Sequence, residues 1–287
     1  MSVVLYERDG RIGRVTLNRP DVLNAIDGAL PQALADAVAE ANADPGVHVI
    51  VLSGAGRAFC AGYDLTYYAE AAAGKGNDVT QEMPWDPVKD YALMKRNTDL
   101  FMSVFRSLKP VICKVHGFAV AGGSDIALCS DIVIMAEDAQ IGYMPARVWG
   151  CPTTAMWVYR LGAERAKRML LTGDKISGTE AERLGLVLKA VPQAELDGEV
   201  ERLAQRMAGV PVNQLAMQKM MVNQALENMG LASTQTLATF FDGITRHSPE
   251  GLNFKARAEE VGWKRAVRER DDGTYDWTDD RPINPGG

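Results

Sequence analysis

Two short turns in the sequence could present backbone amides to a ligand. The first turn, residues 53–62, follows the apolar run 47–52, and the second, residues 116–123, follows the apolar run 111–115. Both turns contain glycines, which allow a ligand to approach the backbone closely. Both also precede helix-like segments, whose first N–H groups have no partner within the helix. Two such donors directed at one oxygen would stabilise negative charge developing there, as in an oxyanion hole.

Asp125 follows the second turn directly and is a candidate proton donor or acceptor. A carboxylate in the first turn of a helix also has an ordinary structural role, because it caps free N–H groups and interacts with the helix dipole. A carboxyl beside two oxyanion donors could equally transfer a proton to or from a substrate. Taken alone, the position favours the capping role and leaves the catalytic one open.

Several other classes of chemistry fit the sequence poorly. A dinucleotide fingerprint starting at Gly54 would need a third glycine at position 59, where Phe59 stands. The 3 histidines and 4 cysteines are scattered without metal-ligand spacing, so we expect no metal and reduced, buried thiols. The formal net charge of -6 is unfavourable for nucleic-acid binding. No membrane-spanning run or signal peptide is apparent, so we expect a cytoplasmic protein without a membrane partner.

The elements that must position these turns alternate between strands and helices. We expect a β-hairpin from residues 3–8 and 12–17, since Asp9-Gly10 lies between them. The other expected elements are helices at 27–43 and 91–108, buried strands at 47–52, 111–115 and 132–135, and a long loop at 69–87. This alternation predicts an α/β fold with parallel strand pairing.

The strand pattern stops near residue 195, and helical patterns take over. We expect helices at 196–209, 212–229, 231–246 and 249–269, followed by an acidic surface tail at 271–277. A chain of 287 residues fits one large α/β domain with a smaller appendage. We therefore predict an α/β core over 1–195 and a helical region over 196–287.

Five segments, in this order along the chain, resemble the signatures of the enoyl-CoA hydratase/isomerase (crotonase) superfamily: 17–25, 57–65, 115–123, 171–176 and 180–187. A single motif would be weak evidence, whereas five in the right order are strong. The resemblance implies a crotonase-like core of repeated ββα units with a C-terminal helical region. It also implies an enzyme that processes acyl-CoA thioesters without a separate cofactor, because coenzyme A arrives as part of the substrate.

The resemblance assigns roles to individual residues. The family's two oxyanion amides fall on Tyr63 and Gly122, and its first catalytic glutamate falls on Asp125. The positions that match the family's coenzyme A channel are Asn24, Ala25, Arg57, Ala61, Asp64 and Leu65. Family members assemble as trimers or paired trimers through the C-terminal helices. We therefore expect a homotrimer or hexamer, in which Phe254 or Lys255 could reach a neighbour's nucleotide.

The chain departs from the family at the second catalytic glutamate. That position falls on Pro145, or on Ala146 if one residue is inserted, and neither side chain can transfer a proton. Tyr143 could donate a proton in its place or could simply form the pocket wall. Arg147 could pair with Asp125.

The reaction class therefore stays open within the family. Hydration of an enoyl-CoA is the leading expectation, and isomerisation, which needs one carboxylate to move a proton, is the alternative. Hydrolase and decarboxylase chemistry, or a non-catalytic acyl-CoA binder, are further alternatives. Three tryptophans could line an acyl pocket, although Trp157 fits core packing better: Trp85, Trp149 and Trp157.

Overall fold

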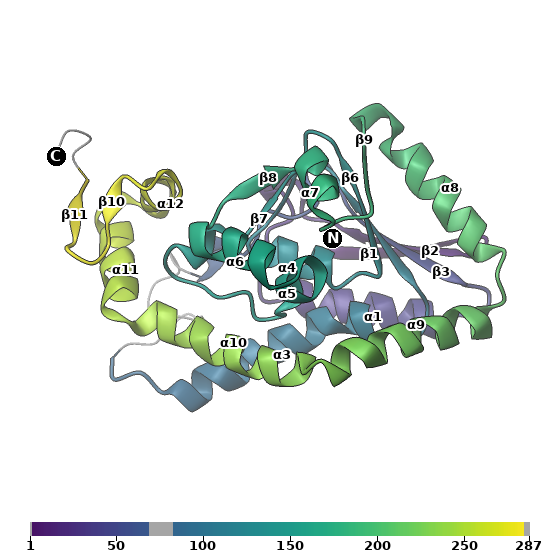
Figure 1. Ribbon diagram of the computed structural model, residues 1–287, viewed down its shortest axis with the longest axis horizontal. Coiled ribbons are helices and arrows are strands. Elements are labelled where there is room, and N and C mark those ends of the chain that lie inside the picture. The colour runs from purple at the N-terminus through teal and green to yellow at the C-terminus, as the bar shows by residue number, and fades with distance from the viewer. Residues whose placement is uncertain (1, 69–82, 284–287) are drawn as a thin grey trace.

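The computed structural model describes residues 2–68 and 83–283. Its centre is a six-stranded sheet in the order β1-β2-β3-β4-β6-β9 (Figure 1). The strands are β1 (Val4–Asp9), β2 (Ile12–Leu17), β3 (Val49–Gly54), β4 (Val111–Val115), β6 (Ile132–Ala136) and β9 (Lys189–Val191). The antiparallel pairing of β1 with β2 confirms the predicted hairpin, and every later neighbour in this sheet pairs in parallel, as expected.

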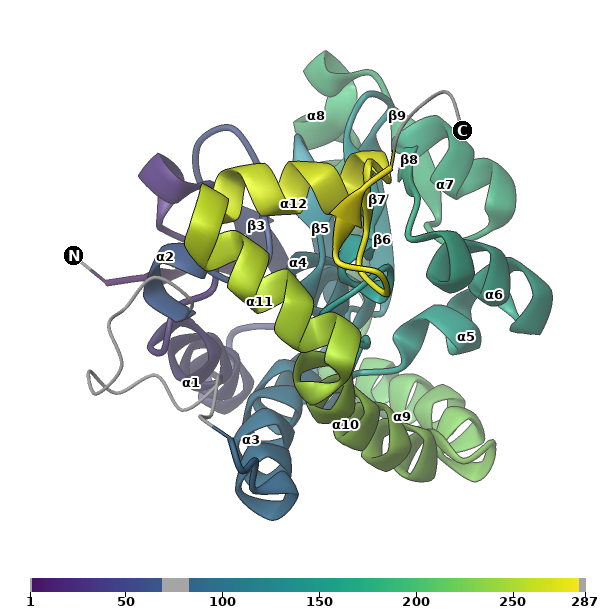
Figure 2. The same ribbon diagram turned by 90° about the vertical axis from the view of Figure 1, so that its left-hand side faces the viewer.

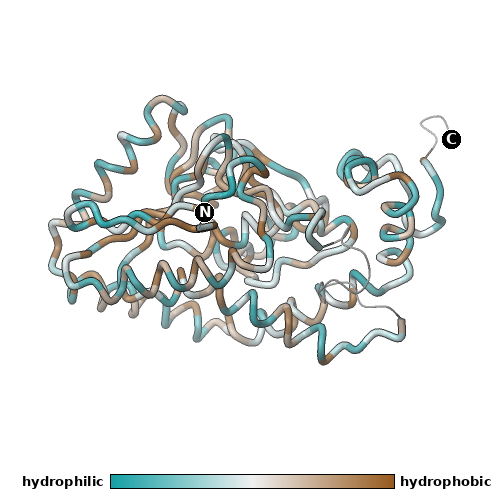
Figure 3. Tube along the Cα trace, turned by 180° about the vertical axis from the view of Figure 1, so that it is seen from behind, coloured by the Kyte–Doolittle hydropathy of each residue, from teal (hydrophilic) through white to brown (hydrophobic). Residues whose placement is uncertain are grey.

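The central strands are mostly apolar because both faces of the sheet are covered. Val49, Ile50 and Val111 are each at most 1% exposed. Strands buried on both faces have continuous β-branched runs rather than alternating polar and apolar residues. Figure 3 shows this difference, with apolar colour along the central strands and mixed colour along the surrounding helices.

A second sheet of three strands supports the candidate site: β5 (Phe118–Val120), β7 (Gln140–Gly142) and β8 (Lys175–Ser177). Two successive strands of the large sheet, β4 and β6, each lead into a strand of this small one, and the first of these units continues into a helix as β4, β5 and α4 (Gly122–Leu128). An isolated bridge between Cys60 and Ala119 brings the first glycine turn to the edge of the small sheet. The structure is thus the α/β crotonase fold that the resemblance implied.

The remaining core helices are α1 (Leu30–Ala43), α2 (Leu65–Tyr68), α3 (Pro87–Arg106), α5 (Met156–Leu161), α6 (Ala163–Thr172) and α7 (Gly178–Leu184). The expected start of the first helix at 27 was wrong by three residues. Asp27 stands before α1, where its carboxylate accepts the N–H groups of Ala29 and Leu30 at 3.0 and 2.9 Å. Of the loop expected at 69–87, residues 69–82 lie outside the described ranges, and Pro87 already begins α3.

The C-terminal helices are α8 (Leu196–Ala208), α9 (Val212–Asn228), α10 (Leu231–His247), α11 (Pro249–Val261) and α12 (Trp263–Asp272). Helices α9 and α10 run along one side of the molecule, and α11 and α12 project beyond its end (Figure 1). The single helix expected over 249–269 was wrong, because Gly262 adopts a left-handed φ of 85° and separates two helices. No helix in the described ranges is long and apolar enough to cross a membrane.

The acidic tail expected at 271–277 is also more ordered than predicted. Tyr275–Asp276 (β10) pairs with Arg281–Pro282 (β11), and the Tyr275 side chain is buried. The ring of Trp277 packs 5.0 Å from that of Phe254. Aromatic side chains alternate with the acidic ones here, and their burial folds the segment back onto α11.

Candidate active site

The backbone amides of Tyr63 and Gly122 belong to two turns that approach each other closely. An isolated bridge pairs Ile26 with Tyr63, and Gly62 O and the Asp64 N–H form the hydrogen bonds of that bridge. This pattern leaves the Tyr63 amide between them, and Gly122 is the first residue of α4. Neither amide donates a hydrogen bond to any residue in the described part of the chain. Both N–H groups are therefore available to one ligand oxygen.

The backbone around these amides requires small residues. A Cβ at Gly62 would lie 2.8 Å from the Ala121 methyl and 3.6 Å from the Gly122 nitrogen, which shows how closely the two turns meet. A Cβ at Gly122 would lie 2.9 Å from the Tyr63 ring. Ala121 itself has a positive φ of 50°, a strained conformation for a residue with a side chain.

Asp125 is buried next to these amides and does not cap its helix. The residue that caps α4 is Ala121, with no side-chain hydrogen bond, whereas Asp125 Oδ1 accepts a hydrogen bond from Thr154 Oγ1 at 2.6 Å. Burial raises the pKa of Asp125 to about 8, Asp242 adds to the effect, and the hydrogen bond from Thr154 partly opposes it. The carboxyl is thus mostly protonated at neutral pH and can release its proton within an accessible range.

A cavity of about 170 Å³ joins the amides and the carboxyl. The residues expected from the sequence that line it are Ala61, Tyr63, Leu65, Gly122, Asp125, Tyr143 and Trp149. Val267, Arg270 and Asp271 of α12 close it from the same chain. Figure 2, which looks at the end from which α11 and α12 project, shows both helices in front of β5 and α4. Of the other tryptophans, Trp157 is buried in the core and Trp85 stacks on His247.

The residues around position 145, where the resemblance implied a second glutamate, do not supply a replacement acid. Tyr143 lines the cavity, but its hydroxyl donates to the Cys151 carbonyl at 2.9 Å, and burial holds the pKa of this tyrosine well above its usual range. Pro145 contributes only an apolar wall. The idea that Arg147 pairs with Asp125 was wrong, because Arg147 bonds the Asp271 carbonyl at 2.7 Å on the outer side.

The structure brings a second carboxylate, Asp242 of α10, to the cavity, and the sequence reasoning missed it. Arg246 lies one turn later on the same helix, and its Nη2 donates to Asp242 Oδ2 at 3.1 Å and to Asp90 Oδ2 of α3 at 3.0 Å. All three side chains are buried. The Asp-x-x-x-Arg spacing was the available signal, but it is typical of ion pairs on solvent-exposed helix faces.

The residues that match the coenzyme A channel form a linked pair of segments. Asn24 is fully buried, and its side chain accepts the Arg19 N–H at 2.7 Å and donates to the carbonyls of Ala55 and Ala58 at 2.8 and 2.9 Å. The Arg19 guanidinium pairs with Asp64 at 2.9 Å. These contacts hold residues 19–25 against residues 55–64 at the side of the first turn.

Among the other residues that match the coenzyme A channel, Arg57 is an exposed cation. Arg57 lies on the surface of the first turn, whereas Ala25 is buried beneath it. No group of three or more His, Cys, Asp and Glu in the described ranges could hold a metal ion. The contacts of these residues with coenzyme A stay a prediction.

The fold and the paired amides place the protein among α/β proteins of the crotonase class. The family model for enoyl-CoA hydratase/isomerase matches residues 7–259, and the chain belongs to this family of enzymes. It is 33% identical over 227 residues to a probable mitochondrial enoyl-CoA hydratase of Dictyostelium discoideum, a match that covers 77% of this chain and 75% of that one.

Solved structures give the same result. The chain is similar to the crystal structure of an enoyl-CoA hydratase from Mycobacterium smegmatis, with a TM-score of 0.89, 47% identity and coverage of 96% and 94%. It is also similar to an enoyl-CoA hydratase/isomerase from Xanthobacter autotrophicus Py2, with a TM-score of 0.85, 29% identity and coverage of 95% and 98%.

Proposed function

We propose that the protein is an enoyl-CoA hydratase-like enzyme that acts on an acyl-CoA thioester, with Asp125 as an acid or base. The observation that carries the proposal is the meeting of two unpaired amides, from Tyr63 and Gly122, and one buried carboxyl at a single cavity. The thioester carbonyl oxygen would lie between the amides. Negative charge that develops there as an enolate would be stabilised by donors that need no reorganisation.

Hydration is the leading reaction because the similar proteins are described as hydratases. Asp125 would exchange a proton with the α carbon of the acyl group, since the amides hold the adjacent carbonyl. Isomerisation is the alternative that the residues favour most, because Pro145 or Ala146 stands where the family has its second glutamate and proton movement between two carbons needs one carboxylate. Coenzyme A would lie along the segments that contain Asn24, Ala25, Arg57, Ala61, Asp64 and Leu65.

A substrate panel tests the proposal directly. Purified protein is incubated with 2-enoyl, 3-enoyl and saturated CoA thioesters of several chain lengths, and the products are followed by mass spectrometry. Addition of one water to a 2-enoyl thioester is the expected result. Conversion of a 3-enoyl into a 2-enoyl thioester without added water would favour the isomerase, and no turnover or calorimetric binding of any thioester would overturn the proposal.

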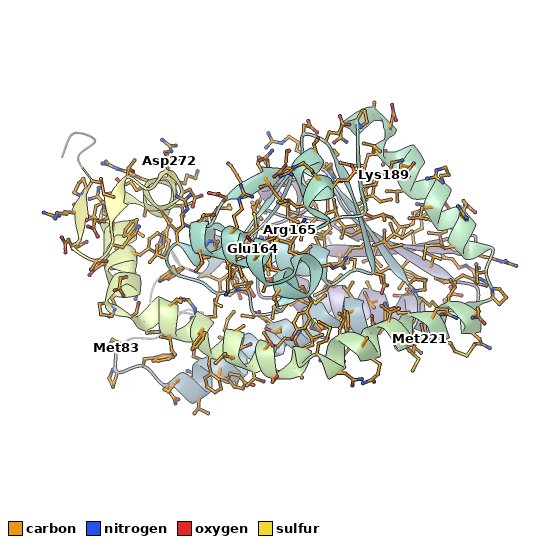
Figure 4. The ribbon with its side chains drawn as sticks, viewed as in Figure 1. Met83, Glu164, Arg165, Lys189, Met221 and Asp272 are labelled. Carbon is orange, nitrogen blue, oxygen red and sulfur yellow. The ribbon has the colours of Figure 1, made fainter. Side chains whose placement is uncertain are left out.

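We also propose that the protein assembles as a trimer or hexamer through its C-terminal helices. Helices α9 and α10 carry large apolar side chains that are more than one third exposed: Met217, Met220, Met221, Val222, Leu237, Phe240, Phe241 and Ile244. Met221 lies on the outer side of α9 (Figure 4). An apolar surface of this extent is typical of a contact between subunits. The cytoplasmic location stays a prediction, since one relative is described as mitochondrial.

A further inference from the structure

Asp242 occupies a place from which it can take part in the reaction at the cavity. It lines the same cavity as Asp125 and the two free amides. Its Oδ1 accepts the N–H of Cys151 at 3.0 Å, and Thr154, three residues later in the same loop, donates to Asp125 at 2.6 Å. One short loop therefore holds both carboxyl groups.

The space between the loop and α10 is open because residue 150 is a glycine. A Cβ at Gly150 would lie 2.7 Å from Pro145 Cβ, 3.3 Å from the Tyr143 hydroxyl and 3.6 Å from Asp242 Oδ1. A larger residue would collide with Pro145 and crowd the Tyr143 hydroxyl, next to Asp242. The chain thus keeps a small residue where Asp242 approaches the wall that contains Tyr143 and Pro145, the wall to which the family's second glutamate belongs.

We infer that Asp242 is the second acid–base carboxylate of this enzyme and takes the role of the family's second glutamate, where this chain has Pro145 or Ala146. The inference rests on the proposed hydratase function and names the residue that would complete it. A hydratase needs one group to take a proton from water and another to give a proton to carbon. Asp125 supplies one of these groups, and Asp242 is a second carboxylate on the same cavity.

The buried cluster of Asp90, Asp242 and Arg246 has a charge balance that allows Asp242 to accept a proton. Asp90 pairs with the Arg246 guanidinium: its Oδ1 lies 3.0 Å from Nη1, and its Oδ2 accepts a hydrogen bond from Nη2 at 3.0 Å. Asp242 approaches the same guanidinium at 3.1 Å from Nη2 and 3.3 Å from Nε. These three residues contain two carboxylates and one cation. When Asp242 takes up a proton, Arg246 still has the Asp90 carboxylate as an ion-pair partner.

The proton balance of hydration assigns a step to each carboxyl. The water oxygen bonds to the β carbon while one water proton moves to the Asp242 carboxylate, and the C=C electron pair becomes an enolate held by the amides of Tyr63 and Gly122. The enolate α carbon then takes the proton of the Asp125 carboxyl. One water has been added, Asp242 is protonated and Asp125 is ionised, and proton exchange with solvent restores both.

The test compares Asp242→Asn with Asp90→Asn. Both variants remove one carboxylate from Arg246, but Asp90 is not among the described residues that line the cavity. The two should lower the melting temperature by similar amounts. Hydration of a 2-enoyl-CoA should fall by about 10²–10⁴ in Asp242→Asn, as expected for loss of a positioned acid or base. In Asp90→Asn it should fall about tenfold or less, since that change only weakens the basicity of Asp242.

A second measurement separates catalysis from misfolding. Exchange of the α protons of butyryl-CoA with deuterated solvent needs the amides and Asp125 but no attack by water. Asp242→Asn should keep this exchange within about tenfold of the native rate, and Asp242→Glu should recover part of the hydration.

Three outcomes would overturn the inference. One is equal loss of hydration in Asp242→Asn and Asp90→Asn. Another is loss of exchange together with hydration in a folded Asp242→Asn variant. The third is a native enzyme that exchanges α protons but hydrates no enoyl thioester, which would leave the enolate chemistry intact. Absence of both activities in the native enzyme would instead overturn the proposed function.

Discussion

Replacing Asp125 by asparagine should make the protein more stable while it removes activity. The carboxyl is 3% exposed, and burial raises its pKa from the ordinary 3.8 to about 8. The folded state therefore binds this proton more tightly than the unfolded chain does. The stability that this bound proton gives the folded state is complete below about pH 4 and is lost as the pH rises to about 8. The amide introduced by Asp125→Asn would keep the shape of the side chain and its acceptor for Thr154 but could not ionise.

The size of this effect follows from the two pKa values. At about 1.4 kcal/mol per pH unit, a rise from 3.8 to about 8 sets a ceiling on the order of 6 kcal/mol above pH 8. Between pH 5 and pH 8 the gain of Asp125→Asn over the native protein should therefore grow by on the order of 3 kcal/mol. Urea unfolding of both proteins at the two pH values measures it.

A matched control and a kinetic measurement complete the experiment. Asp138 is exposed, so Asp138→Asn should show no comparable pH-dependent gain. Turnover of Asp125→Asn should fall by about 10²–10⁴. Its affinity for a CoA thioester should stay within a few fold, because the oxyanion donors are backbone groups. An unchanged stability difference at pH 5 and pH 8 would refute the buried neutral carboxyl, and full turnover would refute its catalytic role.

Three further changes test other parts of the structure. Asn24→Ala should lower the free energy of unfolding by about 2–4 kcal/mol in urea titrations, since it removes three hydrogen bonds and leaves a non-glycine residue at a φ of 55°. Gly122→Ala should lower kcat by about tenfold or more with a small change in melting temperature, because its Cβ would press on the Tyr63 ring at 2.9 Å and shift the oxyanion amide. Met221→Lys should shift the mass measured by light scattering toward the 31.2 kDa monomer, and an unchanged large assembly would exclude this part of α9 from the contact.

The sequence predicted the elements whose signals are local and strong. The β-hairpin followed from Asp9-Gly10 between two apolar runs, and the parallel strands followed from short runs rich in β-branched residues. The motifs of the two turns contain glycine where close contact requires it, as at Gly122 beside Tyr63, and the oxyanion role of these residues stays a prediction. Helix ends were less predictable, because side chains such as Asp27 and a left-handed Gly262 decide them.

The missed residues depend on contacts between distant parts of the chain. Asp242 and Arg246, spaced as i and i+4, resemble a surface ion pair until α10 packs against α3 and buries them with Asp90. The same holds for the tail, where Tyr275 and Trp277 lie among acidic residues that suggested exposure. Their burial depends on Phe254, more than twenty residues earlier in the chain.

If Asp242 is the second carboxylate, its presence at the cavity explains why position 145 holds a proline and not a glutamate. Pro145 lies on the cavity wall, and its Cβ stands 2.7 Å from the point where a Cβ of Gly150 would be, in the region that Asp242 approaches. A glutamate at 145 would add a third buried carboxyl to Asp125 and Asp242, and like charges so close cannot all be ionised. Restoring the family's glutamate, as in Pro145→Glu, should therefore lower hydration rather than raise it. A higher hydration rate in that variant would mean that the family's position, and not Asp242, is where this site needs its second acid.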